Sequence, residues 1–149
     1  MPIAIKDSKI DITSEKLTKE LAKKFTKYLN GGEFVFLYGE MGVGKTTFVK
    51  YFINEIQILN NLPQTEITSP TFSLLNEYQV KDKRIKHYDL FRISRKEDIK
   101  NLEIFEKDNR LITFIEWPQL LTDEQNIKSI DLNFSYLNDL NDRSVDIKV

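Results

Sequence analysis

Eight consecutive residues, Gly39 to Thr46, read GEMGVGKT and match the spacing G-x-x-x-x-G-K-[ST]. Its three glycines remove side chains that would obstruct backbone N–H groups curling around a phosphate. Lys45 supplies a positive charge that can reach the β- and γ-phosphates, and the Thr46 hydroxyl can ligate Mg²⁺. Thr47 either supports the metal or simply begins a helix. The spacing therefore predicts a phosphate-binding loop (P-loop).

The segments on either side of this loop fit that interpretation. Residues 33–38, EFVFLY, form an apolar run without strict alternation, which is typical of a strand buried on both faces. After the loop, apolar side chains recur at helical spacing over residues 46–58. The N-terminus of such a helix directs its partial positive charge at a bound anion. The expected nucleotide contacts in the loop are Met41, Gly42, Val43, Gly44, Lys45, Thr46 and Thr47.

Two acidic residues stand near the ends of later predicted strands. Asp89 follows IKHY, and Glu116 follows the strongly apolar LITFI, as in a Walker-B strand. Strand ends beside the P-loop strand are where an open α/β sheet places its ligands. Either acid could organise a metal, and the alternative for each is a solvated side chain at a strand terminus.

Three other features have both a functional and a structural interpretation. Ser69-Pro70-Thr71 is interpreted either as a switch-like loop whose hydroxyls contact the phosphates or as a turn made rigid by proline. His87, the only histidine, fits a packed or hydrogen-bonded strand residue better than a catalytic base. Trp117 could stack on a base or a partner, or pack in the core.

ATP is the nucleotide that the sequence favours. The chain contains neither the Asn-Lys-x-Asp element that recognises guanine nor an Asp-x-x-Gly switch. No glycine follows Gly44, so a glycine-hinged switch loop is excluded.

The remaining pattern predicts a single domain over residues 1–149, with a three-layer α/β fold and a mixed central sheet. Helices are expected over residues 14–29 and 95–106, and further strands over 71–80, 84–91, 110–117, 129–137 and 143–149. Polar residues at 81–83 and 138–142 are typical of hairpin turns.

Composition limits the classes of function. The net charge is −1 and the sequence pI is about 5.9, so tight binding to nucleic acid by this chain alone is not expected. The chain has no cysteine, no signal-peptide pattern at its N-terminus and no apolar run that could span a membrane. A cytoplasmic protein is expected, with any role on RNA acting through a partner.

Four motifs in this order resemble the bacterial TsaE family: YGEMGVGKTTF, SPTFSLLNEY, HYDLFR and IEWPQ. Members are small ATPases of tRNA threonylcarbamoyladenosine biosynthesis. The resemblance covers nearly the whole chain, from the SEKLT segment to Arg143. Phe91 stands where the family commonly has Tyr, and Gln119 stands where many members have an acid, so no acidic role is assigned at 119.

The resemblance implies a P-loop NTPase fold with a mixed seven-stranded sheet, binding of ATP and Mg²⁺, and slow hydrolysis. The implied partners are the TsaB- and TsaD-type subunits that attach a threonylcarbamoyl group to the adenosine beside the tRNA anticodon. Thr46 and Glu116 become the implied Mg²⁺ ligands, and Asp89 a catalytic or metal-shell acid. Trp117 would lie near the nucleotide, and Arg143 and residues 14–18 would close over it.

The sequence leaves two other functions open, a small-molecule kinase and a non-catalytic adaptor. A small-molecule kinase would normally need a lid that carries arginines, and the five arginines of this chain show no lid-like insertion. A non-catalytic adaptor would use nucleotide binding, rather than turnover, to set its affinity for a partner.

Overall fold

The computed structural model of the protein describes residues 8–121, 127–137 and 141–149. Part of the predicted turn over residues 138–142 lies outside these ranges. The seven strands are β1 (Lys9–Asp11), β2 (Phe34–Tyr38), β3 (Leu75–Val80), β4 (Lys83–Asp89), β5 (Leu111–Glu116), β6 (Ser129–Tyr136) and β7 (Arg143–Lys148). The helices are α1 (Glu15–Tyr28) and α2 (Lys45–Leu59), with two 3₁₀ helices, η2 (Lys96–Leu102) and η3 (Pro118–Leu121).

The strands form one mixed sheet in the order β1-β7-β6-β2-β5-β4-β3. Strand β2 pairs in parallel with β5 and β6, and β4 pairs in parallel with β5. The edges are antiparallel, through β3 with β4 on one side and through β6 with β7 and β7 with β1 on the other. Parallel pairing brings the carboxyl ends of β2, β4 and β5 to one edge of the sheet.

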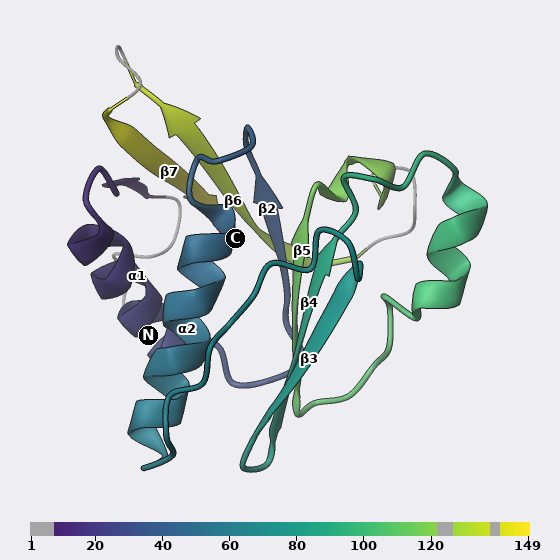
Figure 1. Ribbon diagram of the computed structural model, residues 1–149, viewed down its shortest axis with the longest axis horizontal. Helices are drawn as coiled ribbons and strands as arrows, with labels where there is room; N and C mark the ends of the chain where they lie inside the picture. Colours follow the sequence, from purple (N-terminus) through teal and green to yellow (C-terminus); the bar gives the residue numbers. More distant parts are fainter. Residues whose placement is uncertain (1–7, 122–126, 138–140) are drawn as a thin grey trace.

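The sheet lies between two layers. Helices α1 and α2 lie side by side over one face, and η2 lies over the other (Figure 1). The three-layer α/β fold with a mixed central sheet is therefore confirmed.

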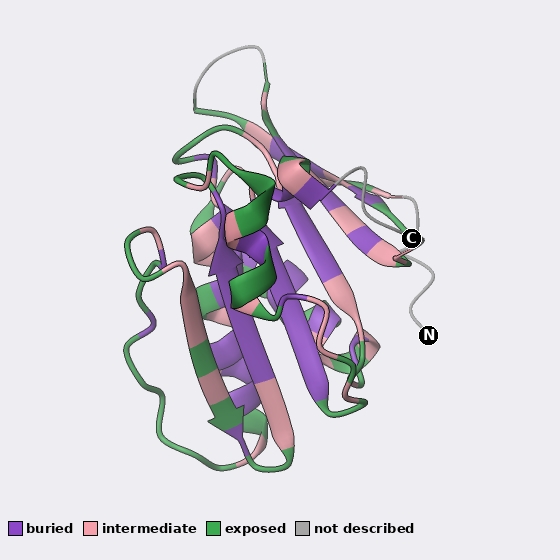
Figure 2. Ribbon diagram, turned by 90° about the vertical axis from the view of Figure 1, so that its right-hand side faces the viewer, coloured by how far each residue is buried: buried purple, intermediate pink, exposed green. Residues whose placement is uncertain are grey.

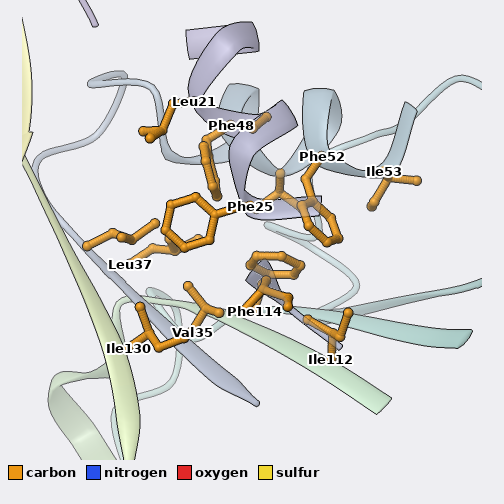
Figure 3. Packing of buried hydrophobic residues seen from close by; sticks show 14 of the residues in the cluster. Leu21, Phe25, Val35, Leu37, Phe48, Phe52, Ile53, Ile112, Phe114 and Ile130 are labelled. Carbon is orange, nitrogen blue, oxygen red and sulfur yellow. The ribbon is translucent and has the colours of Figure 1, made fainter. Parts of the chain in front are cut away.

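Two apolar clusters fill the spaces between these layers. Phe25 from α1, Phe48 and Phe52 from α2 and Phe114 from β5 form a chain of edge-to-face aromatic contacts beneath the helices (Figure 3). On the other face, Phe36, Tyr88 and Ile115 pack against residues of η2 and η3. Strands β2, β4 and β5 are consequently buried along most of their length, whereas edge strand β3 has exposed residues at Glu77 and Gln79 and is fully buried only at Val80 (Figure 2).

The two main helices begin close to where the sequence predicts. The Ser14 side chain caps α1 by accepting a hydrogen bond from the Leu17 amide at 3.3 Å. Gly44 precedes α2 in the left-handed conformation, with φ of 119°.

The structure corrects the bounds of two predicted elements and adds one strand. Residues 71–74 form a turn rather than the start of a strand, because the Leu74 amide donates to the Pro70 carbonyl at 2.7 Å. The helix expected over 95–106 is the shorter η2, which ends at Leu102 because Glu103 follows it in the left-handed conformation. Strand β1 was not predicted, since three residues give too little pattern.

In the described part of the chain, no helix is long and apolar enough to cross a membrane.

Candidate active site

The glycine-rich loop connects β2 to α2 at the carboxyl edge of the sheet. All three of its glycines have positive φ, which is 141° at Gly39. A Cβ at Gly39 would lie 2.8 Å from the Phe134 carbonyl oxygen, and one at Gly44 would lie 3.8 Å from an Arg143 guanidinium nitrogen. Glycine is therefore required at position 39 both by conformation and by the close approach of β6, and at position 44 by conformation alone.

Lys45 is the first residue of α2 and is only 4% exposed. Its Nζ donates to the Gly39 carbonyl at 2.6 Å and lies 3.8 Å from the centre of the Trp117 ring. Burial lowers the pKa of Lys45, and the carboxylates of Glu116 and Asp89 oppose that effect only in part. The ammonium is thus held in a water-poor position at the helix N-terminus.

Glu116, at the end of β5, is the centre of a buried polar cluster. Its Oε2 accepts a hydrogen bond from the Thr46 hydroxyl at 2.8 Å and lies 2.6 Å from Nε2 of His87. A carboxylate accepts, so the His87 ring donates through Nε2. The His87 side chain is fully buried, and its Nδ1 has no hydrogen-bond partner among the described residues. The hydrogen-bonded interpretation of His87 is therefore confirmed, and its partner is one of the predicted site acids.

Asp89 lies opposite Glu116 in the parallel β4–β5 register. Its Oδ2 accepts from the Thr71 hydroxyl at 3.2 Å, and its Oδ1 accepts from the Phe91 amide at 3.0 Å. The Ser69 and Thr71 hydroxyls lie 2.7 Å apart. The Ser69–Thr71 loop is thereby attached to the same acidic edge as the glycine-rich loop.

These groups surround one cavity of about 220 Å³. Its lining comes from the glycine-rich loop, the Ser69–Thr71 loop and the ends of β4 and β5: Met41, Gly42, Gly44, Lys45, Thr46, Thr47, Ser69, Thr71, Asp89, Phe91, Glu116 and Trp117.

Two predicted contacts do not line the cavity. Val43 is fully buried, and its Cγ1 would lie 3.0 Å from a Cβ at Gly39, so its side chain packs against the loop and not against the cavity. Arg143, at the start of β7, lies beside Gly44 and donates to the Thr13 carbonyl at 3.2 Å, which links β7 to the segment before α1.

Sequence reasoning missed Phe91 as a lining residue. Its ring lies 4.9 Å from the Trp117 ring, so the two aromatic residues form one wall. Its place just after the acid at the end of β4 is the signal that could have identified it.

The donor set suits a hard cation and a phosphate. The Thr46 hydroxyl and the two carboxylates are oxygen donors of the kind that Mg²⁺ prefers. No group of three or more His, Cys, Asp or Glu side chains that could hold a metal occurs in the described residues. A metal here would therefore depend on oxygens from a ligand or water, which is the usual arrangement for Mg²⁺ bound with a nucleotide.

Comparison with known proteins decides the family. The family model described as "Threonylcarbamoyl adenosine biosynthesis protein TsaE" matches residues 12–145. This chain belongs to the TsaE family. The chain is 36% identical over 137 residues to the tRNA threonylcarbamoyladenosine biosynthesis protein TsaE of Rickettsia typhi, which covers 92% of each sequence. The TsaE protein of Aquifex aeolicus is 38% identical over 82 residues, which cover 55% of this chain and 59% of that protein.

The crystal structure of Bacillus subtilus YdiB superimposes with a TM-score of 0.70 at 21% sequence identity, covering 93% of this chain and 82% of YdiB. Together with the mixed sheet and the loop between β2 and α2, this likeness identifies a P-loop NTPase fold. TsaE membership gives this chain a place in tRNA threonylcarbamoyladenosine biosynthesis.

Proposed function

We propose that this chain binds ATP and Mg²⁺ in the cavity at the carboxyl edge of the sheet and slowly hydrolyses the ATP. It acts in the cytoplasm with threonylcarbamoyl-transferase subunits of the TsaB and TsaD type, and contacts tRNA only through them. Its ATP hydrolysis supports repeated threonylcarbamoylation of the adenosine beside the anticodon. The observation that carries this proposal is the convergence of the glycine-rich loop, Lys45, Thr46, Asp89 and Glu116 on one cavity.

Each part of the cavity has a role in this proposal. The backbone from Met41 to Thr47 receives the phosphates, because glycine opens the loop and the α2 N-terminus adds its partial positive charge. Lys45 contributes a charge-assisted hydrogen bond to the same phosphates.

Thr46 and Glu116 would hold Mg²⁺, since their oxygens already lie within hydrogen-bond distance of each other. Bound there, Mg²⁺ would neutralise charge that develops on the transferring phosphoryl group. In this proposal Asp89, which lines the cavity, would orient a water or a metal-bound water. Trp117, which also lines the cavity, and Arg143, which lies beside Gly44, would flank the nucleotide.

The Ser69–Thr71 loop is the proposed sensor of the phosphate end. Thr71 contacts Asp89, so a change at that acid reaches the loop directly. A ligand shifts a conformational equilibrium only by its differential affinity for the two states. Hydrolysis is therefore useful to the modification system if the ATP-bound and product-bound states differ in affinity for the partner subunits.

A reconstituted modification assay with tRNA in excess over enzyme tests the proposal. Multiple rounds should require the wild-type chain and fail with Lys45→Ala. Lys50→Ala is the matched control, because Lys50 is an exposed lysine of the same helix. Equal turnover without the chain, or with Lys45→Ala, would contradict the proposed role.

Two further measurements separate the alternatives. Phosphate release that rises when the partner subunits are added supports an ATPase over a non-catalytic adaptor. Transfer of phosphate from ATP to a member of a metabolite panel would instead indicate a kinase.

A further inference from the structure

The indole ring of Trp117 lies directly against the ammonium of Lys45. Nζ is 3.8 Å from the ring centre, well inside the distance at which a cation is attracted to an aromatic face. Lys45 is 4% exposed, so water screens the attraction only weakly.

The backbone holds this ring in a position that tryptophan does not favour. Trp117 has φ of 59°, in the left-handed region that bulky residues rarely adopt. Its amide donates to the Leu37 carbonyl at 3.3 Å, and its ring packs against Phe91. Such strain persists only where the surroundings determine the conformation, and it gathers at functional sites.

The ring restricts a side chain that is otherwise flexible. An ammonium has three N–H donors, and one of them is used by the Gly39 carbonyl at 2.6 Å. The indole face covers another side of the ammonium. The remaining N–H donors of Lys45 are therefore left for a ligand in the cavity that it lines. A lysine without such a neighbour would sample many rotamers and would have to be ordered when the ligand arrives.

We propose that Trp117 is a positioning residue for Lys45, whose ammonium it holds by a cation–π contact at the place where a phosphate binds. This inference rests on the proposed function, since it assigns the contact a role in nucleotide affinity. It differs from a packing or base-stacking role for Trp117, because it depends on the electron density of the ring rather than on its shape.

Trp117 is the only tryptophan of the chain, so fluorinated tryptophans can be incorporated at this one position. Successive fluorines withdraw electron density from the ring face with little change of size. The dissociation constant of a fluorescent ATP analogue should rise stepwise along the series, by about three- to tenfold in total. The same slope is expected in a Phe91→Leu background, which removes the aromatic neighbour and so controls for stacking.

A second measurement needs no nucleotide. The ¹⁹F resonance of the protein carrying 5-fluorotryptophan should shift when Lys45→Met removes the charge, and should move far less with Lys50→Met. Affinity that stays flat along the fluorination series, or equal shifts for the two lysine variants, would overturn the inference. Failure of the unsubstituted protein to bind the analogue would contradict the proposed function instead, and the ¹⁹F result would then decide the contact by itself.

Discussion

Among the described residues, two lysines are almost completely buried, and their surroundings differ in charge. Lys45 is 4% exposed and Lys86 is 3% exposed. Lys86, on β4, faces the side of the sheet away from the two long helices and forms an ion pair with Glu106 at 2.7 Å. Lys45 has no carboxylate within ion-pair distance in the described part of the chain, and its partners are the Gly39 carbonyl and an aromatic ring.

Their pKa values move in opposite directions for this reason. Burial by itself lowers the pKa of Lys86, but hydrogen bonding to Glu106 and the neighbouring charges outweigh it and raise the pKa. For Lys45 burial is the stronger effect, and the pKa falls. A buried cation that forms an ion pair with a carboxylate of the same chain contributes to the structure. A buried cation without such a partner favours the binding of an anionic ligand.

The sharpest test of this difference is Lys45→Ala. Loss of the charge should weaken ATP binding by about a hundredfold, because a charge-assisted hydrogen bond is removed. The thermal unfolding midpoint should stay the same or rise, because removal of a buried ammonium relieves its desolvation, which offsets the lost hydrogen bond to the Gly39 carbonyl and the lost contact with Trp117. Titration with a fluorescent ATP analogue and a melting curve measure both, and unchanged affinity would refute the P-loop assignment.

Glu116→Ala tests the acid that accepts a hydrogen bond from the Thr46 hydroxyl. We expect hydrolysis to fall about ten- to a hundredfold with a smaller loss of nucleotide binding, because the group is proposed to organise Mg²⁺ on the transferring phosphoryl group. Steady-state phosphate release at saturating Mg²⁺, with partner subunits present, is the measurement. A wild-type rate would mean that Glu116 only accepts hydrogen bonds from Thr46 and His87.

Lys86→Met should have the converse effect to Lys45→Ala. The free energy of unfolding should fall by about 1–2 kcal/mol, because Glu106 loses one cationic partner but keeps Arg84. Affinity for ATP should match that of the wild type. Chemical denaturation with the exposed Lys50→Met as control measures this, and a large loss of ATP affinity would show that the two buried lysines are not separate in function.

The pH dependence of stability tests the ion pairs of Glu106, the carboxylate partner of Lys86. Hydrogen bonds from Arg84 and then Lys86 lower the pKa of Glu106 from 4.5 to about 2. The carboxylate therefore stabilises the folded state fully above pH 4.5, and this contribution is lost as the pH falls toward 2.

Since the Glu106 side chain is 31% exposed, we expect the effect to be about 1 kcal/mol. Denaturation of wild type and Glu106→Gln between pH 2 and neutrality should converge at the acid end. A Glu106→Gln difference that persists at the acid end would refute the assignment.

The parts of the site that are local in sequence could be predicted. The loop from Gly39 to Thr46 carries its chemistry in its spacing, and the structure places it between a buried strand and a helix as expected. Asp89 and Glu116 could be named as strand-end acids, but only the parallel register of β4 and β5 sets them opposite each other.

The parts that depend on tertiary packing could not be predicted. The His87–Glu116 contact joins residues of different strands, and the ion pairs of Lys86 require the segment after η2 to return to β4. The left-handed conformation of Trp117 likewise follows from the contacts of its amide and ring, and no propensity indicates it.

The order of strands in the sheet also decides when, during synthesis, the cavity can form. The ribosome releases the complete glycine-rich loop well before it releases β5, and β2 pairs with β5 and β6 rather than with the strands that follow it directly. Non-local parallel pairing of this kind is slow, and the nascent chain has no partner for the Thr46 hydroxyl until Glu116 has emerged. A ligand of this cavity consequently recognises only chains whose central sheet is assembled, and by mass action it protects finished molecules while leaving partly made ones to chaperones and proteases.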